Sequence, residues 1–143
     1  MMTRINDIME RNHTPVCWLQ SVALLAARLW IAKVFFISGL TKIRSWDTTL
    51  VLFAYEYEVP LLAPQTAAYM ATIAELLLPV MLFLGLATPL AAVGLFMMTL
   101  VIELFVYPGT TEHYYWLLLL GLLLTHGGGR LGIDFWIMHH QRP

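Results

Sequence analysis

Four ionisable side chains lie within otherwise apolar stretches of this sequence: Arg28, Lys33, Glu75 and Glu103. A lone charge at the centre of a bilayer costs at least about 2.5 to 3.5 kcal/mol, so each needs a partner if these stretches cross a membrane. Counting about 1.5 Å of rise per residue from the start of each stretch places Arg28 level with Glu75, and Lys33 level with Glu103. We therefore expect two intramembrane ion pairs, Arg28 with Glu75 and Lys33 with Glu103.

Glu75 is followed four residues later by Pro79. A proline at this spacing leaves the carbonyl of residue 75 without its helical donor. A carboxylate beside a freed carbonyl suits a proton, a water, or a hydroxyl or quinol head group. It equally suits a bent helix whose polar groups are satisfied by its neighbours, so both interpretations stay open.

The first apolar stretch carries a polar stripe. At 100° per residue, Arg28, Gly39 and Lys42 fall on one side of a helix, whereas Lys33 points elsewhere. Gly39 would let another helix or a flat ligand approach the backbone closely. Together with Glu75 and Pro79, these three residues form the predicted ligand-binding or intramembrane polar site.

Tyr107 and His113 follow Glu103 and precede a run of aromatic residues. Aromatic belts at membrane interfaces need no further role, so anchoring and the outer rim of a ligand site are both open. We expect no metal site, because the scattered histidines lack cysteine partners and metal-ligand spacing. No hydrolytic triad, phosphate loop or dinucleotide fingerprint is present, and no catalytic residue is assigned.

The composition indicates that the elements carrying these side chains lie in a membrane. Of the 143 residues, 59% are hydrophobic and only 12% are charged, against roughly 25% in soluble proteins. Most of the surface must therefore face lipid. The net charge of −1 gives no support for nucleic-acid binding, and the lone Cys17 excludes an internal disulfide or thiol relay.

We predict an all-α membrane protein built as a bundle of four transmembrane helices. A crossing needs about 20 mostly apolar residues, and such stretches occur at about residues 21–40, 66–86, 89–107 and, more weakly, 114–126. Thr88 can cap the third helix and Pro89 suits its first turn. Between the first two spans, Trp46, Phe53 and other aromatic residues recur at helical spacing, which favours an interfacial amphipathic helix over an ordinary loop.

The predicted organisation is an N-terminal arm (1–20), a membrane domain (21–135) and a short polar tail (136–143). Arg4, Arg11, Arg130 and Arg142 would lie on one side of the membrane, and Lys42 and Arg44 on the other. The positive-inside rule therefore favours cytoplasmic termini.

The motifs resemble the DoxX family of small bacterial membrane proteins. The resemblance covers about residues 24 to 135. It consists of Arg28 followed by Phe35, Phe36, Gly39 and Lys42, then AELLLPVMLFLGLATPLAA with Glu75 and Gly85, then GGGRLGID with Arg130 and Asp134. It implies a four-helix bundle in the inner (plasma) membrane and an association with quinone-linked or stress-related oxidoreductase systems. Lys33, Glu103 and the segment FVYPGTTEH instead resemble a sub-branch associated with small metal-binding peptides.

Three functions are compatible with these residues. The leading hypothesis is a membrane component that binds a quinone-like ligand and supports a soluble or membrane-bound redox partner, with no cofactor of its own. The alternative is a non-catalytic scaffold or accessory protein in metal or oxidative stress, recruiting a soluble partner through the amphipathic connection and the outer loop. A small transporter is a third hypothesis, which would require a homo-oligomer because the polar residues of one protomer are few.

Overall fold

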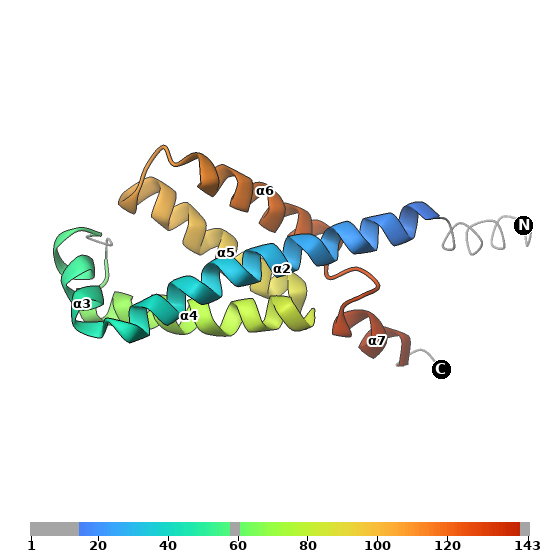
Figure 1. Cartoon of the computed structure of the whole chain (residues 1–143), viewed down its shortest axis with the longest axis horizontal. Coiled ribbons are helices and arrows are strands. Elements are labelled where there is room, and N and C mark those ends of the chain that lie inside the picture. Colours follow the sequence, from blue (N-terminus) through green and yellow to red (C-terminus); the bar gives the residue numbers. More distant parts are fainter. Residues whose placement is uncertain (1–14, 58–60, 141–143) are drawn as a thin grey trace, which may run out of the picture.

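The computed structural model describes residues 15–57 and 61–140, except for the side chains of Met138 and His139. The regular elements of these residues are helices: α2 (Pro15–Arg44), α3 (Trp46–Tyr55), α4 (Pro64–Leu84), α5 (Thr88–Val101), the π-helix η2 (Ile102–Val106), α6 (Thr111–His126) and α7 (Ile133–His140). The four long helices pack into a bundle, with α3 at one end and α7 at the other (Figure 1). The predicted all-α class is confirmed.

The bundle is built from two pairs of helices. The pair α2 and α4 packs beside the pair α5 and α6, and the tight turn between α4 and α5 joins the two. The core between them is aliphatic, as expected for helices whose inward faces alone are shielded from lipid. Its fully buried side chains include Ile31, Leu82, Leu95, Leu120 and Leu123.

Three helical stretches are long and apolar enough to cross a membrane: Pro15–Arg44, Pro64–Leu84 and Thr88–Val106. The first begins six residues before the predicted start at Ser21 and reaches Arg44 instead of Leu40. The fourth predicted span corresponds to α6, whose 16 residues give a length of about 24 Å. That α6 crosses the bilayer stays a prediction.

The amphipathic connection does form a helix, α3, and its apolar face packs on α4. Phe53 is buried against Ala67 and Ala68, and the rings of Trp46 and Tyr69 lie 4.7 Å apart. The face of α3 that carries Phe53 is thus packed within the chain, with Trp46 and Leu50 partly buried beside it. The interfacial position of α3 stays a prediction.

The turn between α4 and α5 is held by the C-terminal segment. Gly85 has φ +68° and Ala87 has φ +45°, so the chain reverses through left-handed conformations. The predicted cap of α5 by Thr88 is wrong. Instead, the backbone N–H groups of Ala87 and Thr88 donate to the two carboxylate oxygens of Asp134, at 2.7 and 2.8 Å. Asp134 lies in the first turn of α7, which continues to His140 through the first part of the predicted tail.

Gly39 sets how closely α2 and α4 approach. A Cβ atom on Gly39 would lie 2.9 Å from Leu76 Cδ2 and 3.1 Å from Glu75 Cβ. Gly39 therefore allows the close approach of another helix, α4. Close approach of a helix and of a flat ligand were the two roles expected for it. This contact also fixes the register, because it places Glu75 level with Gly39.

Candidate functional site

A cavity of about 470 Å³ lies between the helices near the α3 end of the bundle, and we call it the interhelical cavity. This volume falls in the range of roughly 300 to 1,000 Å³ that is usual for small-molecule sites. Its rim includes Leu62, Met70 and Tyr107, which are exposed on the outer surface. The lining residues are Ser38, Lys42, Phe53, Tyr57, Leu62, Ala67, Met70, Ala71, Ala74, Glu75, Met98, Val101, Ile102, Val106, Tyr107, His113 and Trp116.

An ion pair forms the polar part of one wall. Lys42 on α2 donates to Glu75 on α4, with Nζ 2.7 Å from Oε2 and 2.9 Å from Oε1. Ser38, one turn before Lys42, accepts from Nζ at 3.0 Å and donates to Glu75 Oε1 at 3.2 Å. All three ammonium hydrogens can therefore be bonded, whereas the carboxylate keeps lone pairs for another donor.

The predicted pair of Arg28 with Glu75 is wrong, because the helix register separates them. Arg28 lies level with Gly85, where an added Cβ would be 1.9 Å from its Nη1 atom. Gly85 follows Glu75 by ten residues of α4 and its cap, or about 15 Å. Arg28 instead donates to the backbone carbonyl of Leu131 at 3.1 Å.

The predicted pair of Lys33 with Glu103 is also wrong. Lys33 is five residues beyond Arg28, about 7.5 Å from the end of the bundle that holds the α4–α5 turn. Glu103 follows Thr88 of that turn by fifteen residues, or about 22 Å. Glu103 bonds to His113 and to the backbone N–H of Gly109, both at 2.7 Å.

Lys33 and Pro79 share a groove of about 360 Å³ on the outside of α2 and α4, lined also by Ala32, Phe36, Val80 and Phe83. The Lys33 side chain is exposed. Because Cβ atoms point toward a helix N-terminus, its ammonium can extend toward the nearer membrane surface. These two residues lie outside the interhelical cavity.

Tyr107 and Tyr57 both line the interhelical cavity, and their ring centroids lie 5.8 Å apart. The Tyr107 hydroxyl donates to Glu56 Oε1 at the end of α3. This hydrogen bond to a carboxylate, together with burial, raises the pKa of Tyr107 above its ordinary value. The phenol therefore stays a donor and ties α3 to η2.

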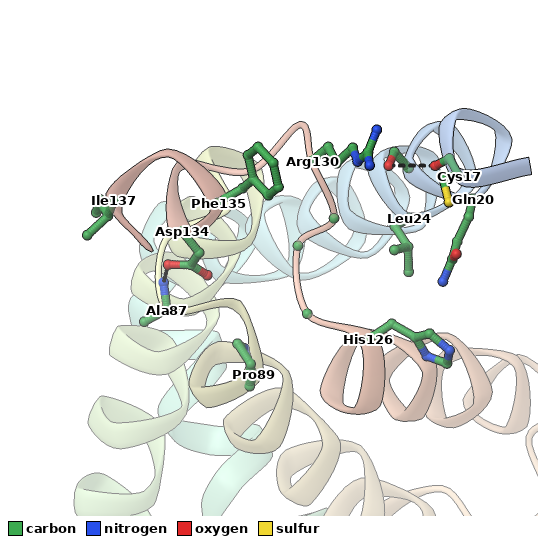
Figure 2. Close-up of a pocket in the computed structure, with 14 residues that line it drawn as sticks. Cys17, Gln20, Leu24, Ala87, Pro89, His126, Arg130, Asp134, Phe135 and Ile137 are labelled. Carbon is green, nitrogen blue, oxygen red and sulfur yellow. Dashed lines mark hydrogen bonds between the residues drawn. The ribbon is translucent and has the colours of Figure 1, made fainter. Parts of the chain in front are cut away.

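A second cavity of about 500 Å³ lies at the opposite end, around the glycine loop 127–129 (Figure 2). In Figure 2 the Asp134 side chain points to Ala87, where it caps α5. Ser21 bonds to the Cys17 carbonyl, and His126 Nδ1 lies near Thr125 Oγ1 and the Leu122 carbonyl oxygen. These polar groups serve the fold, so we place the candidate site in the interhelical cavity.

Four predicted site residues meet on the lining of this cavity: Lys42, Glu75, Tyr107 and His113. Gly39 lies behind Glu75, while Arg28, Lys33 and Pro79 lie elsewhere. Ser38 and Glu56 were not among the predicted site residues. The spacing of Ser38 and Lys42 by one helical turn could have revealed the first, but nothing local links Glu56 to Tyr107.

No group of three or more histidine, cysteine, aspartate or glutamate side chains that could hold a metal ion occurs among the described residues. The His139 side chain lies outside them.

A family model described as DoxX matches residues 23–108 of the chain, which is more than half of it. The match includes α2, α3, α4, α5 and η2, except for the first residues of α2. No curated protein and no solved structure matches the chain.

Proposed function

The chain belongs to the DoxX family, and from that premise we propose that this multi-pass membrane protein binds a quinone-like lipophilic ligand in the interhelical cavity and supports an oxidoreductase partner. The observation that carries the proposal is the ion pair of Lys42 and Glu75 on the wall of a largely apolar cavity. Glu75 is only 3% exposed. A buried charge pair is costly unless its geometry and further hydrogen bonds compensate for desolvation, which makes an intramembrane pair a candidate for a functional site.

The pair offers both kinds of hydrogen bond to a ligand oxygen. Glu75 can accept from a hydroxyl, and Lys42 can donate to a carbonyl in place of one of its bonds to Glu75. Apolar residues such as Met70, Ala71 and Met98 surround the remainder of the space. A lipophilic ring with an oxygen substituent satisfies both environments.

The exposed rim supports entry from the lipid phase, because Leu62 and Met70 lie on the outer surface of helices that face the bilayer. In the proposed arrangement, a partner protein provides the redox cofactor and this chain binds and orients the ligand. The proposal places the chain in the inner membrane with cytoplasmic termini.

The test is binding of a short-tailed benzoquinone to the full chain in lipid nanodiscs, followed by quenching of tryptophan fluorescence. Trp116 lines the cavity and should report the ligand. Glu75→Gln and Lys42→Met should each weaken binding about tenfold or more, equivalent to about 1.4 kcal/mol. Lys33→Met is the matched control, since Lys33 lies on the same helix outside the cavity.

Saturable binding that both cavity variants weaken and the control retains would support the proposal. Absence of binding by the parent chain, or equal binding by all variants that remain folded, would overturn it. In that case a scaffold that captures a partner without a ligand becomes the better hypothesis.

A further inference from the structure

The α5–α6 wall of the interhelical cavity carries a second pair of ionisable groups, Glu103 of η2 and His113 of α6. Glu103 Oε2 and His113 Nδ1 lie 2.7 Å apart, and the two residues are only 7% and 5% exposed. The other carboxylate oxygen, Oε1, accepts from the backbone N–H of Gly109 at 2.7 Å. Glu103 is thus held from two directions.

This arrangement determines which ring nitrogen of His113 meets a ligand. A carboxylate can only accept hydrogen bonds, so Glu103 selects the form of His113 that carries a proton on Nδ1. Nε2 is then left for the cavity that His113 lines. Trp116 packs on the imidazole with ring centroids 5.1 Å apart and limits its rotation.

The two polar pairs belong to different helix pairs. Lys42 and Glu75 come from α2 and α4, whereas His113 comes from α6, and all three line one cavity with apolar residues between them. A ligand oxygen bound at Lys42 and Glu75 leaves the second ring nitrogen of His113, Nε2, for another hydrogen bond, since Nδ1 is already bonded to Glu103. A second oxygen on the same ligand would satisfy it.

We propose that the interhelical cavity selects a ring with oxygens at its two ends, as in a para-quinone or its hydroquinone. One oxygen binds at Lys42 and Glu75, and the other at His113 Nε2. Neutral His113 accepts a hydrogen bond from a hydroquinone hydroxyl, and protonated His113 donates to a quinone carbonyl. Glu103 is a positioning residue that acts through His113. This inference rests on the proposed function and specifies its ligand.

The test compares two ligands with the same short tail, a para-hydroquinone and the corresponding phenol that lacks one hydroxyl. The parent chain in nanodiscs should bind the hydroquinone about tenfold or more tightly than the phenol. The phenol has one oxygen and therefore leaves one of the two polar sites without a ligand partner. His113→Phe should reduce this preference to near unity. His126→Phe is the matched control, since His126 lies on the same helix but not on the interhelical cavity.

A second measurement needs no change at His113 that could affect folding. Nitrogen-15 spectra of labelled histidine should show His113 protonated on Nδ1 in the parent and lose this signature in Glu103→Leu. Adding the hydroquinone to the parent should shift the His113 Nε2 resonance.

The outcomes separate this inference from the proposed function. If the parent binds neither quinone nor hydroquinone, the proposed function fails and the inference fails with it. If it binds both hydroquinone and phenol equally well, if a folded His113→Phe protein keeps the preference, or if bound hydroquinone leaves the Nε2 resonance unchanged, the proposed function stands and this inference is overturned.

Discussion

Arg28 is a buried cation whose immediate surroundings are glycines. It is 1% exposed, and its Nη1 atom lies beside Gly85, Gly128 and Gly132. Only residues without side chains leave room for the planar guanidinium at this point. Its hydrogen bond to the Leu131 carbonyl joins α2 to the C-terminal loop. Arg28 therefore acts in the architecture of the α7 end, away from the interhelical cavity.

Gly85→Ala should destabilise the chain by more than about 2 kcal/mol. The added Cβ would lie 1.9 Å from Arg28 Nη1 and 2.5 Å from Gly132 Cα, and the residue has φ +68°. Gly121→Ala is the control, because nothing lies within 4 Å of its Cβ position in α6. This change should be neutral or stabilise by up to about 1 kcal/mol. Thermal unfolding in detergent measures both, and equal melting temperatures would contradict the prediction.

Tyr107 should ionise at higher pH than an ordinary tyrosine, since its hydroxyl donates to the Glu56 carboxylate. A raised pKa in the folded chain means that this contact stabilises the fold below about pH 10, the ordinary phenol value, and is lost as pH rises through the raised value. The phenolate absorbance of the parent minus that of Tyr107→Phe gives the titration. Glu56→Gln should move it to lower pH, and an unchanged titration would contradict the assignment.

At the scale of elements, the start of α5 depends on a carboxylate 46 residues away in sequence. Asp134→Ala should cost roughly 0.5 to 2 kcal/mol, the usual effect of losing a helix cap. Hydrogen exchange at the amides of Ala87 and Thr88 should accelerate. Asp47→Ala is the control, because Asp47 is an exposed aspartate in the first turn of α3. Unchanged protection of both amides would show that Asp134 does not cap α5.

Helix identity could be predicted from the sequence because apolar runs and prolines are local signals. The apolar run of α4 and the position of Pro89 at the start of α5 illustrate this. Ion-pair partners could not, since they depend on how helices slide against one another. The predicted depths counted α2 from Ser21, but its contacts place Arg28 already level with the α4–α5 turn. Because of this shift, the residue of α2 that pairs with Glu75 is Lys42 and not Arg28.

Glu103 shows a second limit of periodicity. It lies in the π-helix η2, where backbone bonds run from i to i+5, so the usual rotation of 100° per residue no longer gives its direction. Part of the candidate cavity could nevertheless be predicted from the sequence. Lys42, Glu75, Tyr107 and His113 stand out by residue type alone, whereas their meeting required the fold.

At the scale of the whole molecule, we expect α6 to complete an even number of crossings, so that its two ends face opposite sides of the membrane. Single cysteines at Thr110 and Leu131, in a Cys17→Ser background, should react with an impermeant maleimide from opposite sides. The 16 residues of α6 span about 24 Å, less than the bilayer core of about 30 Å, so local thinning or flanking aromatic residues must compensate. Labelling of both cysteines from the same side would exclude the fourth crossing.

The contacts of Asp134 also impose an order on biogenesis. Its carboxylate caps α5 and its backbone N–H donates to the Gly85 carbonyl at 2.9 Å, while the neighbouring Leu131 carbonyl accepts from Arg28. Translation proceeds from the N-terminus, so α2, α4 and α5 are synthesised before Leu131 and Asp134. The turn between α4 and α5 therefore lacks its Asp134 cap until this later segment has been made, and the α7 end of the bundle can close only then.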